Sequence, residues 1–177
     1  MTRPLLALPL VALLTTAGCA AGDGSTSTFP PTSFGPARGV SAAVAQTRGE
    51  LVRVLGERRL TLVDAPVPFR PAEGRTLTDA PRAVFQVVLP DDPDRGYIVV
   101  YELPDPGQAA DAAREQATYL ASGPGRVQSS LNARDIIRLV GSTVVLYSWI
   151  PDEANDPSAP DVQAALETLG LKVDVPS

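Results

Sequence analysis

The sequence contains no histidine, one cysteine, one methionine and one tryptophan among its 177 residues. Without histidine, the chain has no Ser-His-Asp or Cys-His nucleophilic machinery and no imidazole-ligated metal. The single Cys19 cannot form an intramolecular disulfide, and a lipid attached to it leaves no thiolate for catalysis or metal binding. These absences favour a non-enzymatic protein without a cofactor, and they leave only carboxylate, lysine or tyrosine chemistry open to an enzyme.

Positive charge is also scarce. The chain has 15 basic and 20 acidic residues, which gives a net charge of −5, and Lys172 is the only lysine. Residues 1–18 contain one charge, Arg3, so removing them would give a net charge of −6. Nucleic acids and anionic lipids are bound by clustered cations. The sequence therefore predicts no nucleic-acid partner and no membrane contact driven by charge.

Residues 1–18 have the three parts of an export signal. A short region with Arg3 precedes an apolar run over residues 5–14, and the small residues Ala17 and Gly18 follow. Such a region ends at a cleavage site flanked by small residues. The apolar run would span roughly 15 Å as a helix, about half the hydrocarbon core of a bilayer. We therefore expect a signal peptide and not a membrane-spanning helix.

The end of this segment, Ala17-Gly18-Cys19, resembles the lipobox of bacterial lipoproteins, with Thr16 where that family usually has an aliphatic residue. The resemblance implies cleavage before Cys19 and a diacylglyceryl group on its thiol. It also implies an exported protein, anchored by lipid to the cell membrane or the outer membrane, with its domain outside the cytoplasm. The alternative is an ordinary signal peptide, cut at Ala17 or Ala20, in which Cys19 is incidental.

The rest of the chain divides into a tether, residues 19–36, and a single domain, residues 37–177. The tether is rich in Gly, Ser, Thr and Pro without any periodic pattern, and it would reach roughly 20–25 Å as a flexible chain. In the domain we expect a helix over 38–56, a short strand over 60–63, a Pro-rich irregular segment over 65–82 and a strand over 83–89.

From residue 97 the pattern predicts strand, helix, strand, strand, helix, strand. Asp105 and Pro106 are typical of a helix start, Gly123-Pro124-Gly125 of a helix end, and Gly141-Ser142 of a hairpin turn. This order predicts an α+β domain with an antiparallel sheet and helices mainly on one face, ferredoxin-like over residues 97–175 and preceded by a helix and two strands. The alternative is a less regular α+β domain in which residues 171–175 do not pair.

The C-terminal half is also similar to small bacterial lipoproteins of unknown function. The shared features are Val100-Tyr101-Glu102 before an Ala-rich helix, an apolar strand over 144–147, and a closing Leu-x-x-Leu-Gly over 166–170. The resemblance implies a shared fold and no particular activity.

The first candidate site is acidic. In a βαββαβ sheet the loops before the first strand and after the third strand lie side by side, and both are rich in carboxylates. Oxygen ligands of this kind suit Ca²⁺, although the spacing matches no EF-hand, and the alternative is a pair of solvated turns. The six residues are Asp91, Asp92, Asp94, Asp152, Glu153 and Asp156.

The second candidate site is aromatic. Tyr97 and Tyr101 share one face of their strand, and Tyr147 and Trp149 share one face of theirs. On an open sheet face they would form a surface for a protein, peptide or glycan of the cell envelope. The alternative is that they pack in the core.

Together these features predict a membrane-tethered lipoprotein of the cell envelope that acts as a non-enzymatic binding or accessory domain. The alternative is a lipid-anchored cation-binding protein or carboxylate-dependent enzyme that uses the loops 91–94 and 152–156.

Overall fold

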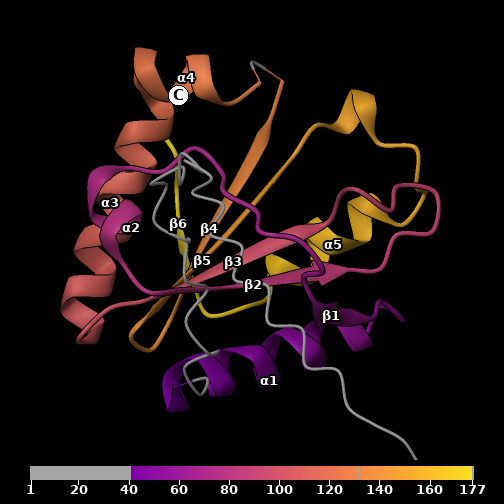
Figure 1. Ribbon diagram of the computed structural model, residues 1–177, viewed down its shortest axis with the longest axis horizontal. Helices are drawn as coiled ribbons and strands as arrows, with labels where there is room; N and C mark the ends of the chain where they lie inside the picture. Colours follow the sequence, from indigo (N-terminus) through magenta and orange to yellow (C-terminus); the bar gives the residue numbers. More distant parts are fainter. Residues whose placement is uncertain (1–40, 131, 177) are drawn as a thin grey trace, which may run out of the picture. The chain divides into compact units, whose positions relative to one another are not determined.

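A six-stranded antiparallel sheet runs through the domain in the computed structural model, which describes residues 41–130 and 132–176 (Figure 1). These residues belong to one compact unit, and its class is α+β, as predicted. None of its helices is long and apolar enough to cross a membrane. The helices are α1 (Ala42–Gly56), α2 (Arg75–Asp79), α3 (Pro106–Ala121), α4 (Gly123–Gln128) and α5 (Ala159–Leu166). The strands, in sheet order, are β1 (Leu62–Asp64), β2 (Arg82–Val87), β3 (Tyr97–Glu102), β5 (Thr143–Trp149), β4 (Arg134–Val140) and β6 (Leu171–Val173).

The central strand β3 is buried on both faces. Ile98 and Val100 pack into a core formed with α1 and α5, whereas Val99 and Tyr101 pack into a second core formed with α2 and α3. A strand that lacks apolar–polar alternation is typical of a sheet covered on both sides. The expectation that helices lie mainly on one face is therefore corrected, because α1 and α5 cover one face of this sheet and α2 and α3 cover the other.

The predicted order strand, helix, strand, strand, helix, strand is confirmed from β3 to β6. The placement of the last strand differs from a ferredoxin-like sheet, in which it would lie beside the first. Here β6 pairs with β4, with Val173 opposite Ile137, because β2 already occupies the free edge of β3. Gly170 has a φ of 45° and turns the chain from α5 directly into β6, where a Cβ would overlap the carbonyl oxygen of Leu139.

Capping residues set the starts of α3 and α4. The Asp105 carboxylate accepts a hydrogen bond of 2.8 Å from the backbone N–H of Gln108, and Pro106 occupies the first helical position, as predicted. The stretch Gly123-Pro124-Gly125 was expected only to end α3. It does so, and it also begins α4, because the Ser122 side chain caps the new helix.

The Pro-rich segment 65–82 is held against α3. It includes the short helix α2, whose Leu77 is buried in the α3-side core. The buried Gln116 of α3 accepts a hydrogen bond of 2.7 Å from the N–H of Gly74 and donates one of 2.8 Å to the carbonyl of Ala72. These bonds fix the segment on the α3 side of the sheet, and Phe69 packs against the same core.

Candidate functional site

The sheet forks at one end, because the β2–β3 pair and the β4–β5 pair separate there. Pairing between β3 and β5 stops at Ile98, which lies opposite Tyr147. Strand β5 stays paired with β4 for two more residues, as far as Trp149 opposite Arg134. Figure 1 shows β4 and β5 spreading away from β2 and β3 toward this end. A cavity of about 520 Å³ opens there, which we call the fork cleft.

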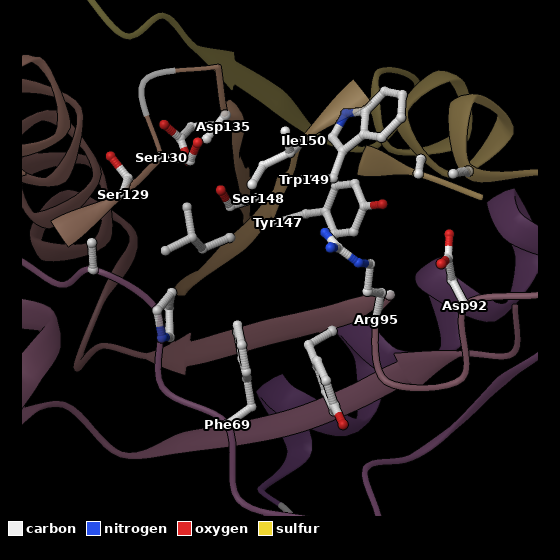
Figure 2. Close-up of a pocket in the computed structure, with 18 of the residues that line it drawn as sticks. Phe69, Asp92, Arg95, Ser129, Ser130, Asp135, Tyr147, Ser148, Trp149 and Ile150 are labelled. Atoms are coloured by element: carbon white, nitrogen blue, oxygen red, sulfur yellow. The ribbon is translucent and has the colours of Figure 1, made fainter. Parts of the chain in front are cut away.

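Aromatic rings line the fork cleft. Phe69 stacks on Tyr97, with ring centroids 4.6 Å apart and an angle of 10° between the ring planes. Figure 2 shows Phe69 and Trp149 on opposite sides of the cleft. The indole Nε1–H of Trp149 donates a hydrogen bond of 3.0 Å to Gln163 of α5, which fixes the ring. Partly exposed rings held in this way offer apolar surface to a ligand without first having to be ordered.

One end of the fork cleft is polar. Asp135 of β4 lies opposite Ser148 of β5, and Ser129 and Ser130, which follow α4, line the same end (Figure 2). Burial raises the pKa of the Asp135 carboxyl above its ordinary value of 3.8, and the neighbouring Ser148 side chain opposes that shift in part. Within the described part of the chain, no arginine or lysine forms a salt bridge with Asp135.

Two arginines line the fork cleft, and each is paired with a carboxylate. The Nε of Arg70 lies 2.8 Å from Glu73, which raises the pKa of the Arg70 guanidinium above its ordinary value. A guanidinium nitrogen of Arg95 lies 3.0 Å from Glu153. Both guanidinium groups therefore have an acidic partner, although Arg70 shares Glu73 with Arg82, whose guanidinium lies 2.9 Å from the same carboxylate.

The two acidic loops lie side by side, as the topology predicted, and Asp92 joins them. Its carboxylate accepts hydrogen bonds from the backbone N–H groups of Asn155 (2.6 Å) and Asp156 (2.9 Å) and from the side-chain amide of Asn155 (2.9 Å). These bonds lower the pKa of the Asp92 carboxyl below its ordinary value of 3.8. The Asp92 carboxylate thus serves as the hydrogen-bond acceptor for two backbone N–H groups of the facing loop.

The other carboxylates of these loops are also directed to protein partners or to solvent. Asp156 is buried and accepts a hydrogen bond of 3.1 Å from the N–H of Asp91. The side chain of Glu153 pairs with Arg95, and Asp91, Asp94 and Asp152 are exposed. Over residues 41–130 and 132–176, no group of three or more Asp, Glu, Cys or His side chains is arranged to hold a metal ion.

The four candidate aromatic residues are divided between the two faces of the sheet. Tyr97 and Tyr101 lie on the α3 side, whereas Tyr147 and Trp149 lie on the side of α1 and α5. Tyr101 and Tyr147 are both buried, so they belong to the core. Tyr97, Tyr147 and Trp149 line the fork cleft, and of these Tyr97 and Trp149 are partly exposed. The structure therefore brings them together at the end of the sheet, not on an open face.

Several residues of the fork cleft were not singled out from the sequence. Phe69 stands alone in a Pro-rich segment, and nothing local indicates that it meets Tyr97. Asp135 begins an apolar strand, where a charged residue is typical of a strand end. One signal in the sequence was available, because Asp135 is followed directly by Ile136 and Ile137. A strand with apolar residues so close to its start tends to bury the neighbouring carboxylate as well.

No family model, curated protein or solved structure matches the chain.

Proposed function

We propose that this protein is an exported, membrane-tethered binding protein that takes a small ligand in the fork cleft. The observation that carries the proposal is the cleft itself. Its volume of about 520 Å³ lies within the roughly 300–1,000 Å³ of small-molecule sites. Its lining also has the composition of such sites, with aromatic surface and a few polar groups at one end.

The proposed tether depends on the N-terminal sequence. Cys19 lies outside the described residues, so its support is the apolar run 5–14 followed by Ala17-Gly18-Cys19. On this proposal the lipid on Cys19 holds the protein at the cell membrane or the outer membrane, and the ligand is met outside the cytoplasm.

The contacts in the cleft support binding more than catalysis. Hydrolysis by a carboxylate pair needs two acids about 5–10 Å apart, with the pKa of one raised by its partner or by burial. Burial raises the pKa of Asp135, and no second carboxylate contributes to the shift. Three of the six acids in the 91–94 and 152–156 loops are engaged by backbone amides or by Arg95, and the other three are exposed, which also weakens the case for a cation site there.

A fluorescence screen tests the proposal, because Trp149 is the only tryptophan and lines the cleft. The full chain in a nonionic detergent is titrated with ring-containing fragments of positive, zero and negative charge. We expect at least one fragment to change Trp149 emission along a saturating curve.

Two variants show whether the response comes from the cleft. Ser148→Phe fills the polar end with a ring, whereas Leu171→Phe adds a ring at an exposed position of β6 that does not line the cleft. The saturating response should be lost in the first variant and kept in the second. A response unchanged by Ser148→Phe, or no saturating response to any fragment, would contradict the proposed function.

A further inference from the structure

The charged side chains that line the fork cleft differ in whether they have a partner of opposite charge. Arg70 and Arg95 each have a carboxylate within 3.0 Å, and Asp92 accepts three hydrogen bonds from the facing loop. Asp94 is exposed at the rim and has no salt bridge in the described part of the chain. Asp135 is partly buried, lies opposite Ser148 in the sheet, and forms no salt bridge in the described part of the chain. The charge left without an opposite partner in the cleft is therefore negative.

We propose that the ligand of the fork cleft is an organic cation, in which a protonated amine meets Asp135 and an apolar body lies between Phe69 and Trp149. This inference rests on the proposed function and adds the chemical class of the ligand.

The cost of drawing Asp135 out of water is what favours a cation. A buried carboxylate without a counter-charge raises the free energy of the folded protein, which is why burial raises its pKa. A bound ammonium group would remove that cost and gain a charge-assisted hydrogen bond. Ser129, Ser130 and Ser148 line the same end, and their hydroxyl oxygens can accept the remaining ammonium protons.

The aromatic lining suits the apolar body of such a ligand. The partly exposed rings of Phe69 and Trp149 offer it apolar surface, while its ammonium group lies at the polar end. An anionic ligand would meet Asp135 directly, and the two arginines that could offset this repulsion already bind Glu73 and Glu153. A neutral polyol could hydrogen-bond Asp135 as well, so the charge of the ligand is the property to vary.

Three ligands that share a phenyl ring and a short alkyl chain separate these possibilities. They are 2-phenylethylamine (cation), 2-phenylethanol (neutral) and 3-phenylpropionate (anion), each titrated against the full chain in nonionic detergent while Trp149 emission is recorded. We expect the amine to bind roughly tenfold to a hundredfold more tightly than the alcohol, as a hydrogen bond to a charged group implies. The anion should bind most weakly.

Asp135→Asn is the decisive variant, and Asp152→Asn removes one charge from an exposed position outside the cleft. Asp135→Asn should weaken amine binding by roughly tenfold or more while leaving 2-phenylethanol binding within about threefold. Asp152→Asn should leave both unchanged. Should Asp135→Asn not fold, the order of the three ligands on the unaltered chain decides.

Amine binding that is no tighter than alcohol binding, or that survives Asp135→Asn, overturns the inference. If the alcohol or the anion binds in that case, the cleft is still a ligand site and only the chemical class is wrong. If none of the three ligands binds, and no fragment of the broader screen does, the proposed function fails with it.

Discussion

The Tyr101 hydroxyl donates a hydrogen bond of 2.6 Å to the carboxylate of Glu73, joining the central strand to the Pro-rich segment that carries Phe69. The same carboxylate binds Arg70 at 2.8 Å and Arg82 at 2.9 Å, and its side chain is only 3% exposed. Burial and the charge of Glu73 raise the pKa of the Tyr101 phenol far above its ordinary value of 10.0. One buried acid therefore fixes the wall of the fork cleft to the core of the sheet.

Removing this bond should destabilise the fold. We expect Tyr101→Phe to lower the free energy of unfolding by roughly 1.5–3 kcal/mol, the usual contribution of a hydrogen bond to a charged group. Urea denaturation measures the change. Tyr119→Phe is the matched control, because the Tyr119 hydroxyl has no hydrogen-bond partner among the described residues and its loss should cost little. Equal stability of the two variants would contradict the role given to Glu73.

The junction of the two loops should depend on the charge of Asp92. Both oxygens of the Asp92 carboxylate accept hydrogen bonds from N–H groups of the facing loop. In Asp92→Asn one oxygen becomes an NH₂ group, which cannot accept such a bond, so we expect a lower melting temperature at pH 7. Since the folded pKa of Asp92 is lowered, its stabilising effect is present above pH 3.8 and is lost as the pH falls through the lowered value. The difference in melting temperature between Asp92→Asn and the unaltered chain should therefore disappear at low pH.

The control for this experiment is Asp91→Asn. Asp91 is exposed and only its backbone N–H bonds to the facing loop, so its replacement should leave the melting temperature unchanged at every pH. A difference for Asp92→Asn that does not vary with pH would show that its carboxylate charge is not what joins the loops.

Replacing Asp135 with Asn should raise the melting temperature at pH 7, whereas replacing Asp92 with Asn should lower it. Its folded pKa is raised, so the ionised form costs stability above that pKa, and the cost vanishes below 3.8. The charged groups that line the same cleft, Arg70, Arg95, Asp92 and Asp94, do not contribute to this shift. We therefore expect Asp135→Asn to melt at a higher temperature than the unaltered chain at pH 7 and at the same temperature below pH 3.8.

This result would bear directly on function. A residue that lowers the stability of the fold but is needed for binding is typical of a functional site. Such sites often retain a destabilising residue because the activity requires it. A lower melting temperature of Asp135→Asn at neutral pH would instead make Asp135 a structural residue.

Much of the fold could be predicted from the sequence, because its signals are local. The capping pair Asp105-Pro106, the turn at Gly141 and the apolar runs of the strands identify each element from β3 to β6. The meeting of the two acidic loops followed from topology alone. Which edge the last strand joins could not be predicted, because β6 pairs through only three residues and its place depends on β2, far away in the sequence.

The fork cleft was harder to predict for the same reason. It depends on where pairing between β3 and β5 stops, and no local pattern near Ile98 or Tyr147 marks that point. Both faces of β3 are apolar, so the expectation of an open face with exposed aromatics fails there. The aromatic residues were recognised as candidates, but their partners Phe69 and Asp135 come from segments joined to them only by tertiary structure.

The proposed membrane anchor is tested by Cys19→Ser. Serine offers no thiol for a lipid, so we expect the protein to move to the soluble fraction or to accumulate with its signal peptide uncleaved. Cell fractionation and the mass of the purified chain distinguish these outcomes from the unaltered protein. A variant that is cut normally and stays with the membrane would show that Cys19 is not the anchor.

The most direct test of the fork cleft is the accessibility of its own tryptophan. Acrylamide quenching of Trp149 is measured on the full chain while 2-phenylethylamine is added. A ligand held between Phe69 and Trp149 covers the indole, so the quenching constant should fall along a saturating curve. In Ser148→Phe it should not respond to the amine. A quenching constant of the unaltered chain that stays the same at every amine concentration would contradict the account.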